Sequence, residues 1–264
     1  MTAVWIAIGV LTVIGLLLGI GLGLAAHFMA VKENEKAVAL REMLPGANCG
    51  GCGFSGCAEY AAALAESPNL RTNLCPVGGD ATAKAIAAYL GSEPEETVKK
   101  TARVLCRGTK ECRKVRAEYV GVATCRAAKA LYSGGSACVY GCLGFGDCVT
   151  ACDTQAISIR HGVAVVASSL CLGCARCVGV CPQKLITLLP EGTPAVLCRN
   201  TEKGAATKAA CGAGCVGCRM CEKACAFGAI TMDGGLARID SEKCTGCGAC
   251  LSACKFGVIS LKSE

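Results

Sequence analysis

The sequence predicts an α+β protein made of small domains that metal staples together in place of a large apolar core. Three observations lead to this fold class. The chain has 25 cysteines in 264 residues but only 4% aromatic residues, so metal ligands are abundant and core material is scarce. The cysteines fall in closely spaced runs that repeat along the chain. An apolar stretch near the N-terminus is long enough to cross a membrane.

The apolar stretch runs from Val4 to Phe28 and contains no formally charged residue if His27 is neutral. Since about 20 apolar residues span the hydrocarbon core of a bilayer, we expect one transmembrane helix. A cleaved signal peptide is the alternative. No lysine or arginine precedes the stretch, however, and it is long for the apolar part of such a peptide.

Residues within and after this stretch predict its partners and its orientation. Gly15, Gly19 and Gly23 lie four residues apart and indicate close contact with a second membrane helix, unless they simply face lipid. Basic residues follow the stretch, namely Lys32, Lys36 and Arg41. We therefore expect a single-pass protein of the inner membrane with its remaining domains on the cytoplasmic side.

The most informative pattern lies in residues 171–181, where four cysteines have the spacing Cys-x2-Cys-x2-Cys-x3-Cys and Pro182 follows. Bacterial ferredoxins hold iron–sulfur clusters with this spacing. Two more runs, in 215–225 and 244–254, repeat it. Zinc would require two cysteine pairs that are usually separated by a longer loop, and disulfides do not require three ligands at intervals of three. The runs therefore favour iron–sulfur clusters over both.

The fourth cysteines of the runs reveal a duplication. Cys152 and Cys181 are separated by the same interval as Cys225 and Cys254, and a short β pattern follows each of them. We expect two two-cluster ferredoxin modules, in which the fourth cysteine of each run ligates the other cluster. The regular runs then give three ligand sets, which are Cys215, Cys218, Cys221 and Cys254; Cys244, Cys247, Cys250 and Cys225; and Cys171, Cys174, Cys177 and Cys152.

The remaining run of the first module is irregular. Phe145 stands where Cys218 would align, so Cys138 is the expected replacement ligand. A three-iron cluster or an empty site is the alternative. The expected set is Cys138, Cys142, Cys148 and Cys181.

Another cysteine group follows the membrane stretch, with the spacing Cys-x2-Cys-x4-Cys-x17-Cys. The glycines between these cysteines permit a backbone that wraps tightly around a cluster. We expect one 4Fe–4S site in a small helical domain, with a zinc knuckle as the alternative. Its ligands are Cys49, Cys52, Cys57 and Cys75.

The five remaining cysteines fall into a weaker pattern. Residues 104–107 (Val-Leu-Cys-Arg) have the same sequence as residues 196–199, and a further cysteine follows each segment before its ferredoxin run. This echo predicts a sixth cluster and leaves Cys112 spare; a set of buried thiols, or a site that uses Cys112, is the alternative. The expected ligands are Cys106, Cys125, Cys198 and Cys211. In all, the cysteines predict about six 4Fe–4S clusters.

The formal charge of +7 does not indicate nucleic-acid binding. Each oxidised cubane with its four thiolates carries about −2, so several clusters outweigh the excess of basic residues. Eight basic residues crowd one segment, as a docking surface for an acidic electron carrier or as compensation for cluster charge. They are Lys99, Lys100, Arg103, Arg107, Lys110, Arg113, Lys114 and Arg116.

Motifs for organic chemistry are missing from the sequence. No Gly-x-Gly-x-x-Gly motif follows a predicted strand, the closely spaced Gly19, Gly21 and Gly23 lie inside the apolar stretch, and no phosphate-binding loop occurs. His27 and His161 do not make a plausible acid–base site. We therefore expect no catalytic residue on this chain and no cofactor other than clusters.

The order of these features resembles the RnfB family, the B subunits of Rnf ion-translocating electron-transport complexes, in its long cysteine-rich form. The most specific parts are residues 48–53 (Asn-Cys-Gly-Gly-Cys-Gly) behind a membrane stretch and residues 140–148 (Tyr-Gly-Cys-Leu-Gly-Phe-Gly-Asp-Cys). Proline follows only two of the fourth cysteines, Cys75 and Cys181. Proline is not a ligand, so we expect altered potential or stability at the others.

The resemblance implies a membrane-anchored subunit of a ferredoxin:NAD oxidoreductase that translocates Na⁺ or H⁺. Such a subunit accepts electrons from reduced ferredoxin (or flavodoxin) and passes them to flavin-bearing and iron–sulfur partners, while the nicotinamide site lies on another subunit. We expect electrons to enter at the exposed C-terminal modules and leave through the Cys49–Cys75 site. Alternatives are an electron-transfer subunit of a hydrogenase or another reductase, or a membrane-tethered redox sensor.

The expected organisation is therefore one N-terminal transmembrane helix, a small helical 4Fe–4S domain, a basic segment and two ferredoxin-like modules. Their boundaries are 1–30 for the helix, 31–92 for the cluster domain, 93–136 for the basic segment, 137–190 for the first module and 191–264 for the second.

Overall fold

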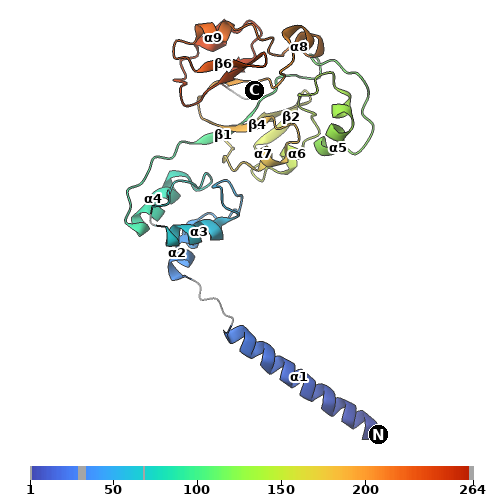
Figure 1. Ribbon diagram of the computed structural model, residues 1–264, viewed down its shortest axis with the longest axis vertical. Coiled ribbons are helices and arrows are strands. Elements are labelled where there is room, and N and C mark those ends of the chain that lie inside the picture. Colours follow the sequence, from blue (N-terminus) through green and yellow to red (C-terminus); the bar gives the residue numbers. More distant parts are fainter. Residues whose placement is uncertain (1, 29–33, 68, 262–264) are drawn as a thin grey trace.

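The computed structural model describes residues 2–28, 34–67 and 69–261 (Figure 1). The chain is a mixed helix and strand protein, as predicted. After the first helix come a small helical domain and a larger α+β unit. Lys32, which contributed to the predicted orientation, lies outside the described residues.

Helix α1 (Thr2–Phe28) is built from leucine, isoleucine, valine, alanine and glycine, without proline. Its large apolar side chains are exposed; Trp5, for example, is 71% exposed. Within the described part of the chain, α1 is the one helix long and apolar enough to cross a bilayer, over Val4–Ala25. An apolar surface of this size has no stable place in water.

The small helical domain consists of α2 (Glu35–Met43), α3 (Cys57–Glu66) and α4 (Gly79–Leu90). Asn34 begins α2 by accepting a hydrogen bond from the backbone N–H of Lys36 at 3.0 Å. Leu40, Tyr60 and Ile86, one from each helix, are buried together in its core. The Tyr60 hydroxyl donates to the Arg71 carbonyl at 2.8 Å and fixes the loop that leads to Cys75.

The α+β unit contains four two-stranded antiparallel sheets and no larger sheet among the described residues. Two are hairpins, β2 (Ile157–Arg160) with β3 (Val163–Val166) and β6 (Ile230–Asp233) with β7 (Leu236–Ile239). The other two pair distant segments, β1 (Lys100–Val104) with β4 (Ile186–Pro190) and β5 (Ala195–Val196) with β8 (Ile259–Ser260). Short helices connect them, namely α5 (Cys125–Ala130), the 3₁₀ turn η1 (Tyr132–Gly135), α6 (Asp147–Thr150), α7 (Arg176–Val180), α8 (Gly204–Ala210), α9 (Met220–Ala224) and α10 (Ala249–Ala253).

The two echoing segments occupy equivalent places in this unit. After β1, the backbone N–H of Leu105 donates to the Leu185 carbonyl at 2.7 Å; after β5, that of Leu197 donates to the Val258 carbonyl at 2.8 Å. Leu185 and Val258 each follow the last cysteine of a run by four residues. The repeated sequence therefore corresponds to a repeated strand pairing.

Cysteine side chains form part of the cores of the α+β unit, as the shortage of aromatic residues predicts. In the first half, Val104, Ile157 and Leu185 pack with buried thiols, including those of Cys142, Cys148 and Cys177. In the second half, aliphatic residues surround Cys221 and Cys250 in the same way. Protein packing alone therefore leaves each half with a small apolar core.

The helical domain has the more conventional core, and it can be tested by truncating Leu40. We expect Leu40→Ala to lower the free energy of unfolding of this domain by about 2–5 kcal/mol, because it removes a fully buried side chain between α2 and α3. Urea unfolding of the full-length protein in detergent, followed by tyrosine fluorescence and circular dichroism, would measure the change. Val38→Ala, on the same helix but 38% exposed, should cost under about 1 kcal/mol. Equal losses for the two variants would contradict the described packing.

Candidate metal centres

The first group of thiols lies in the small helical domain. Cys49, Cys52, Cys57 and Cys75 line one cavity, beneath Tyr60. The loop is shaped by Gly50 and Gly53, which adopt φ values of +71° and +90°. Asn48 accepts a hydrogen bond from the Cys57 N–H at 2.9 Å, and the Gly78 N–H donates to the Cys75 sulfur at 3.4 Å. The predicted set of four is thus brought together.

The second group is built on the cysteine run at 171–177. Burial, together with the nearby thiols of Cys171, Cys174 and Cys152, raises the pKa of the Cys177 thiol to about 12. The Ala102 N–H, from strand β1, donates to the Cys171 sulfur at 3.4 Å. Residue 152 therefore joins the run at 171–177, as the crossed pattern predicts.

The third group corrects the expected ligand set of the irregular run. Cys125, Cys142, Cys148 and Cys181 line one cavity, in which Cys125 occupies the place expected for Cys138. Asp147 explains the difference, because its carboxylate accepts from the N–H groups of Cys125 at 2.8 Å and Arg126 at 3.1 Å. These bonds hold the start of α5 against α6. Thr124 caps α5 by accepting from the Ala127 N–H at 3.2 Å.

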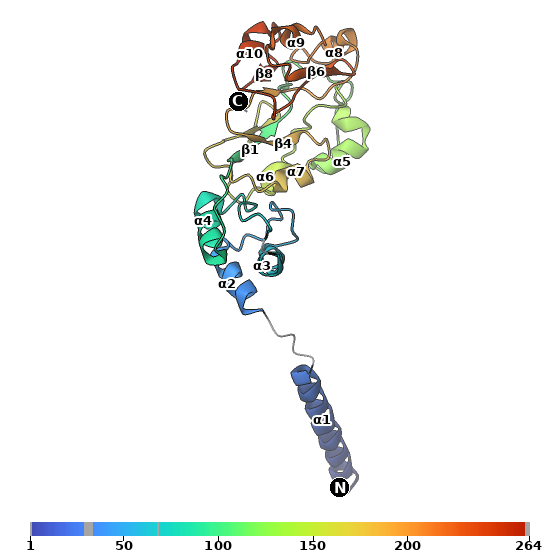
Figure 2. The same cartoon turned by 60° about the vertical axis from the view of Figure 1, so that its left-hand side comes forward.

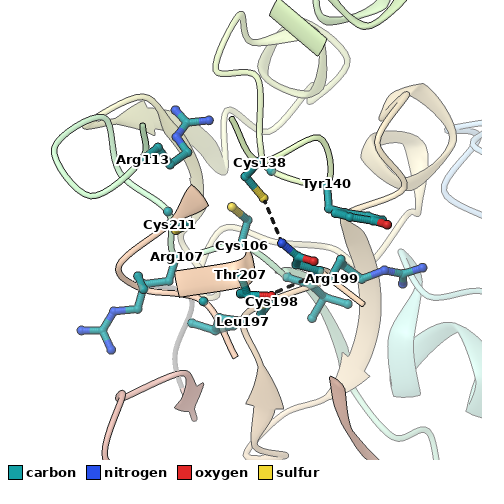
Figure 3. A pocket seen from close by; sticks show the side chains of 16 residues that line it. Cys106, Arg107, Arg113, Cys138, Tyr140, Leu197, Cys198, Arg199, Thr207 and Cys211 are labelled. Carbon is teal, nitrogen blue, oxygen red and sulfur yellow. Dashed lines mark hydrogen bonds between the residues drawn. The ribbon is translucent and has the colours of Figure 1, made fainter. Parts of the chain in front are cut away.

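The fourth group lies between the two halves of the α+β unit (Figure 3). Cys106, Cys138, Cys198 and Cys211 line its cavity, so the expected set of Cys106, Cys125, Cys198 and Cys211 is wrong in one member. Cys138 and Cys125 have exchanged places between the third and fourth groups. The exchange follows from the Asp147 contact, which commits Cys125 to the third group.

Asn200 belongs to the fourth group although sequence reasoning did not single it out. Only 1% of it is exposed. Its side-chain amide donates to the Cys138 sulfur at 3.9 Å, and its backbone N–H donates to the Cys198 sulfur at 3.5 Å (Figure 3). Its place two residues after Cys198, in the echoed segment, was the signal that could have revealed it.

Cys112 stands beside this group without lining the cavity. Its thiol is close enough to Cys211 to raise the pKa of that thiol, which burial already raises, to about 12. Thr109 donates its hydroxyl to the Cys112 sulfur at 3.5 Å. Cys112 therefore lies next to the fourth group but outside the lining of its cavity.

The fifth and sixth groups occupy the C-terminal half. One cavity is lined by Cys215, Cys218, Cys221 and Cys254, and the other by Cys225, Cys244, Cys247 and Cys250. The fourth cysteine of each run therefore lies with the other run, as predicted. Cys218 and Cys247 are exposed, whereas the remaining cysteines are buried or half-buried.

The electrostatics of the cavities favour a cationic inorganic core. Burial raises the pKa of Cys142 to about 11 and that of Cys148 to about 12, so these thiols stay neutral at pH 7 without a positive partner. Iron supplies the positive charge that turns a thiol into a thiolate ligand. Within the described residues, no three histidine, cysteine or acidic side chains lie close enough to hold one metal ion. Four thiols spread around a cavity fit a polynuclear cluster better than a single zinc ion.

The six groups follow one another in space. The loop at Gly51 of the first group meets the backbone of Cys174 in the second. The second and third groups exchange their fourth cysteines: Cys152 lies with the run at 171–177, and Cys181 lies with Cys142 and Cys148. The Cys142 N–H of the third group donates to the Cys106 sulfur of the fourth at 3.4 Å.

The C-terminal half continues the series. Cys215 lies close enough to Cys198 to influence its pKa, which burial raises, and so links the fourth group to the fifth. The fifth and sixth groups exchange their fourth cysteines in the same way, with Cys254 in the fifth group and Cys225 in the sixth. Figures 1 and 2 show the matching succession, from the helical domain through the first half of the α+β unit to the second half.

The basic segment contains both inward-facing and exposed residues. Arg103 is only 4% exposed. Arg113 donates to the carbonyls of Cys142 and Gly162, and Arg107 donates to the Gly257 carbonyl. These arginines tie the segment to both halves of the α+β unit, while the lysines of the segment are exposed.

Comparison with known proteins agrees with these centres. Three family models match: a putative Fe–S cluster domain at residues 44–77, the LdpA Fe–S cluster-binding domain at 145–190 and a 4Fe–4S dicluster domain at 214–258.

Relatives match almost the whole chain. The B subunit of the Na⁺-translocating ferredoxin:NAD⁺ oxidoreductase complex of Acetobacterium woodii is 40% identical over 92% of this chain and 73% of its own length. The B subunit of the ion-translocating oxidoreductase complex of Methanosarcina acetivorans is 42% identical over 90% of both chains. The B subunit of the proton-translocating ferredoxin:NAD⁺ oxidoreductase complex of Clostridium ljungdahlii is 36% identical over 91% of this chain and 85% of its own. The chain belongs to the RnfB family, the B subunits of Rnf-type ion-translocating oxidoreductase complexes, as an iron–sulfur electron-transfer subunit.

Proposed function

We propose that this chain carries single electrons from reduced ferredoxin, through six 4Fe–4S clusters, to flavin-bearing and iron–sulfur partners in the membrane. The complex as a whole transfers electrons from ferredoxin to NAD and moves Na⁺ or H⁺ across the membrane. The unbroken succession of six four-thiol groups is the observation that carries this proposal. The names of the relatives from A. woodii and C. ljungdahlii support the substrates.

Each group of thiols would hold one cluster as its four ligands. The proposed sets are Cys49, Cys52, Cys57 and Cys75; Cys152, Cys171, Cys174 and Cys177; Cys125, Cys142, Cys148 and Cys181; Cys106, Cys138, Cys198 and Cys211; Cys215, Cys218, Cys221 and Cys254; and Cys225, Cys244, Cys247 and Cys250. When bound, such clusters supply centres that gain and lose one electron.

The chain's own residues would set the properties of these centres. Backbone N–H groups donate to ligand sulfurs, among them Leu185 to Cys181 and Val258 to Cys254, each at 3.4 Å. Such bonds favour the reduced, more negative state and raise the reduction potential. Burial of the aliphatic shell keeps water from most of the sulfurs. No residue needs to act as an acid, a base or a nucleophile.

The proposed path has an entry and an exit. Entry of electrons at the C-terminal half is supported by exposed Cys218 and Cys247, and by Phe227 and Phe256, which are 53% and 38% exposed beside the two cavities. The first group, in the domain that follows α1, would deliver electrons to membrane partners. The apolar, exposed α1 supports a single span, and the basic residues Lys36 and Arg41 that follow it support a cytoplasmic location of the remaining domains.

Anaerobic metal analysis tests the proposal directly. Full-length protein should contain about 24 iron atoms and as much acid-labile sulfide, because each four-cysteine site holds a cubane. Reduced ferredoxin should bleach its visible absorption when the two proteins are mixed. Colourless or zinc-loaded protein, or clusters that ferredoxin does not reduce, would overturn the proposed function.

The exchange of Cys125 and Cys138 gives a sharper test of two ligand sets. We expect Cys125→Ser to perturb the third group and Cys138→Ser the fourth, so that each variant alters or loses a different EPR signal. Cys112→Ser is the control and should keep the full iron content, because Cys112 lines neither the cavity of the third group nor that of the fourth. The assignment fails if both variants change the same signal, or if Cys112→Ser loses a cluster.

Asn200 provides a test that leaves every thiol in place. Asn200→Ala removes the side-chain N–H that donates to the Cys138 sulfur, so the potential of the fourth centre should fall while the iron content is kept. EPR-monitored redox titration measures the change. Thr201→Ala, at the exposed neighbour, should leave all potentials where they are. A potential that stays constant in Asn200→Ala would show that this amide does not tune the centre.

A further inference from the structure

The seam between the helical domain and the α+β unit brings two glycine-containing loops together. Across the seam, a methyl group built on Gly51 would lie 3.3 Å from the Cys174 carbonyl oxygen, and within its own domain it would lie 2.8 Å from Pro76 Cγ. On the other side of Pro76, a methyl group on Gly173 would lie 2.5 Å from the Lys100 carbonyl oxygen and 3.8 Å from Pro76 Cβ. The loop of the first thiol group is therefore pressed against the loop of the second.

We propose that Gly51 and Arg176 are positioning residues that set the close approach of these two centres, and so the rate of electron transfer across the seam. The proposal rests on the proposed electron-carrying function. The proposal goes beyond that function, because it assigns to the seam the transfer of electrons from the α+β unit to the membrane-proximal domain.

Gly51 fits this role because there is little room for a side chain at this position, whereas its backbone conformation does not require glycine. Gly50 and Gly53 have positive φ values, but Gly51 does not. An alanine at 51 would therefore keep the loop conformation that Cys49 and Cys52 need. What it would change is the gap to Cys174, because its methyl group would lie 3.3 Å from the Cys174 carbonyl oxygen, a tight contact with backbone of the other unit, while Pro76 at 2.8 Å blocks its retreat into its own domain.

The Arg176 guanidinium stabilises the same seam through two polar contacts. Its Nη1 pairs with the Asp153 carboxylate, which follows Cys152, and its Nη2 donates to the Ala47 carbonyl at 3.3 Å. Ala47 precedes the first thiol group by two residues. One guanidinium thus joins the second centre's loops to the first centre's loop, a geometry that a lysine ammonium cannot reproduce.

The step itself involves no bond and no proton. One electron leaves the site of Cys152, Cys171, Cys174 and Cys177, which is oxidised, and arrives at the site of Cys49, Cys52, Cys57 and Cys75, which is reduced. Reduced ferredoxin replaces the electron. Because tunnelling slows steeply with distance, a small widening of the seam should slow this step without changing the driving force.

The test compares full-length wild type with Gly51→Ala and Arg176→Lys under anaerobic conditions. Protein is mixed with reduced ferredoxin and frozen at successive times for EPR; the signal of the first centre is assigned by its loss from a Cys52→Ser variant. Magnetic coupling between the first and second centres is measured in fully reduced samples, as a readout of distance independent of activity. Gly179→Ala is the matched control, since a methyl group there meets nothing within 4 Å.

Both seam variants should keep wild-type iron content and potentials but show weaker coupling, and the first centre should be reduced on the order of tenfold more slowly. The control should match wild type. Unchanged coupling and rate in iron-replete variants would overturn the seam proposal while leaving the proposed function intact. If Gly51→Ala loses its first cluster, Arg176→Lys decides by the same two measurements. If ferredoxin fails to reduce the first centre even in wild type, the proposed function itself fails.

Discussion

The structure depends on the attraction between thiolate sulfur and a positively charged inorganic core. The cores of the α+β unit contain few large side chains, and burial raises the pKa of cysteines at their centres, such as Cys148, Cys177 and Cys221. Without a cation, these positions hold neutral thiols around cavities, which contribute little cohesion. When an inorganic core is bound, the four cysteines of each group tie their segments of chain to a common centre. A chain that is poor in aromatic residues can thereby hold many short loops in fixed places.

Much of this arrangement could be predicted from the sequence because cluster ligation imposes local spacing. Runs such as 171–177 place three ligands within seven residues of chain, so they identify a site without knowledge of the fold. The crossed fourth cysteine follows from the duplication, and the structure brings Cys152 to that run. The echo around Cys106 and Cys198 also corresponds to a real repeat in strand pairing. The length of the apolar stretch likewise predicted α1.

Long-range choices could not be predicted in the same way. The spacing favoured Cys138 as the fourth ligand of the irregular run, because Cys138 directly precedes Cys142 by one helical turn's length of chain whereas Cys125 lies much further back. The choice depends on Asp147, whose carboxylate binds the start of α5. Asn200 was missed for a related reason, because an amide that donates to sulfur leaves no spacing signature. In the crowded basic segment, the sequence could not tell the buried Arg103 from exposed neighbours such as Lys110 and Arg116.

The fourth group of thiols has a consequence for how the protein is made. Cys106 and Cys138 are synthesised well before Cys198 and Cys211, whereas the first three groups are complete once residue 181 has left the ribosome. Clusters could be installed upstream during translation, but this one must wait for the C-terminal half to fold back. The fourth group can therefore form only in a complete, correctly folded chain. A truncated or misfolded chain would lack this centre and could not pass electrons from one half of the α+β unit to the other.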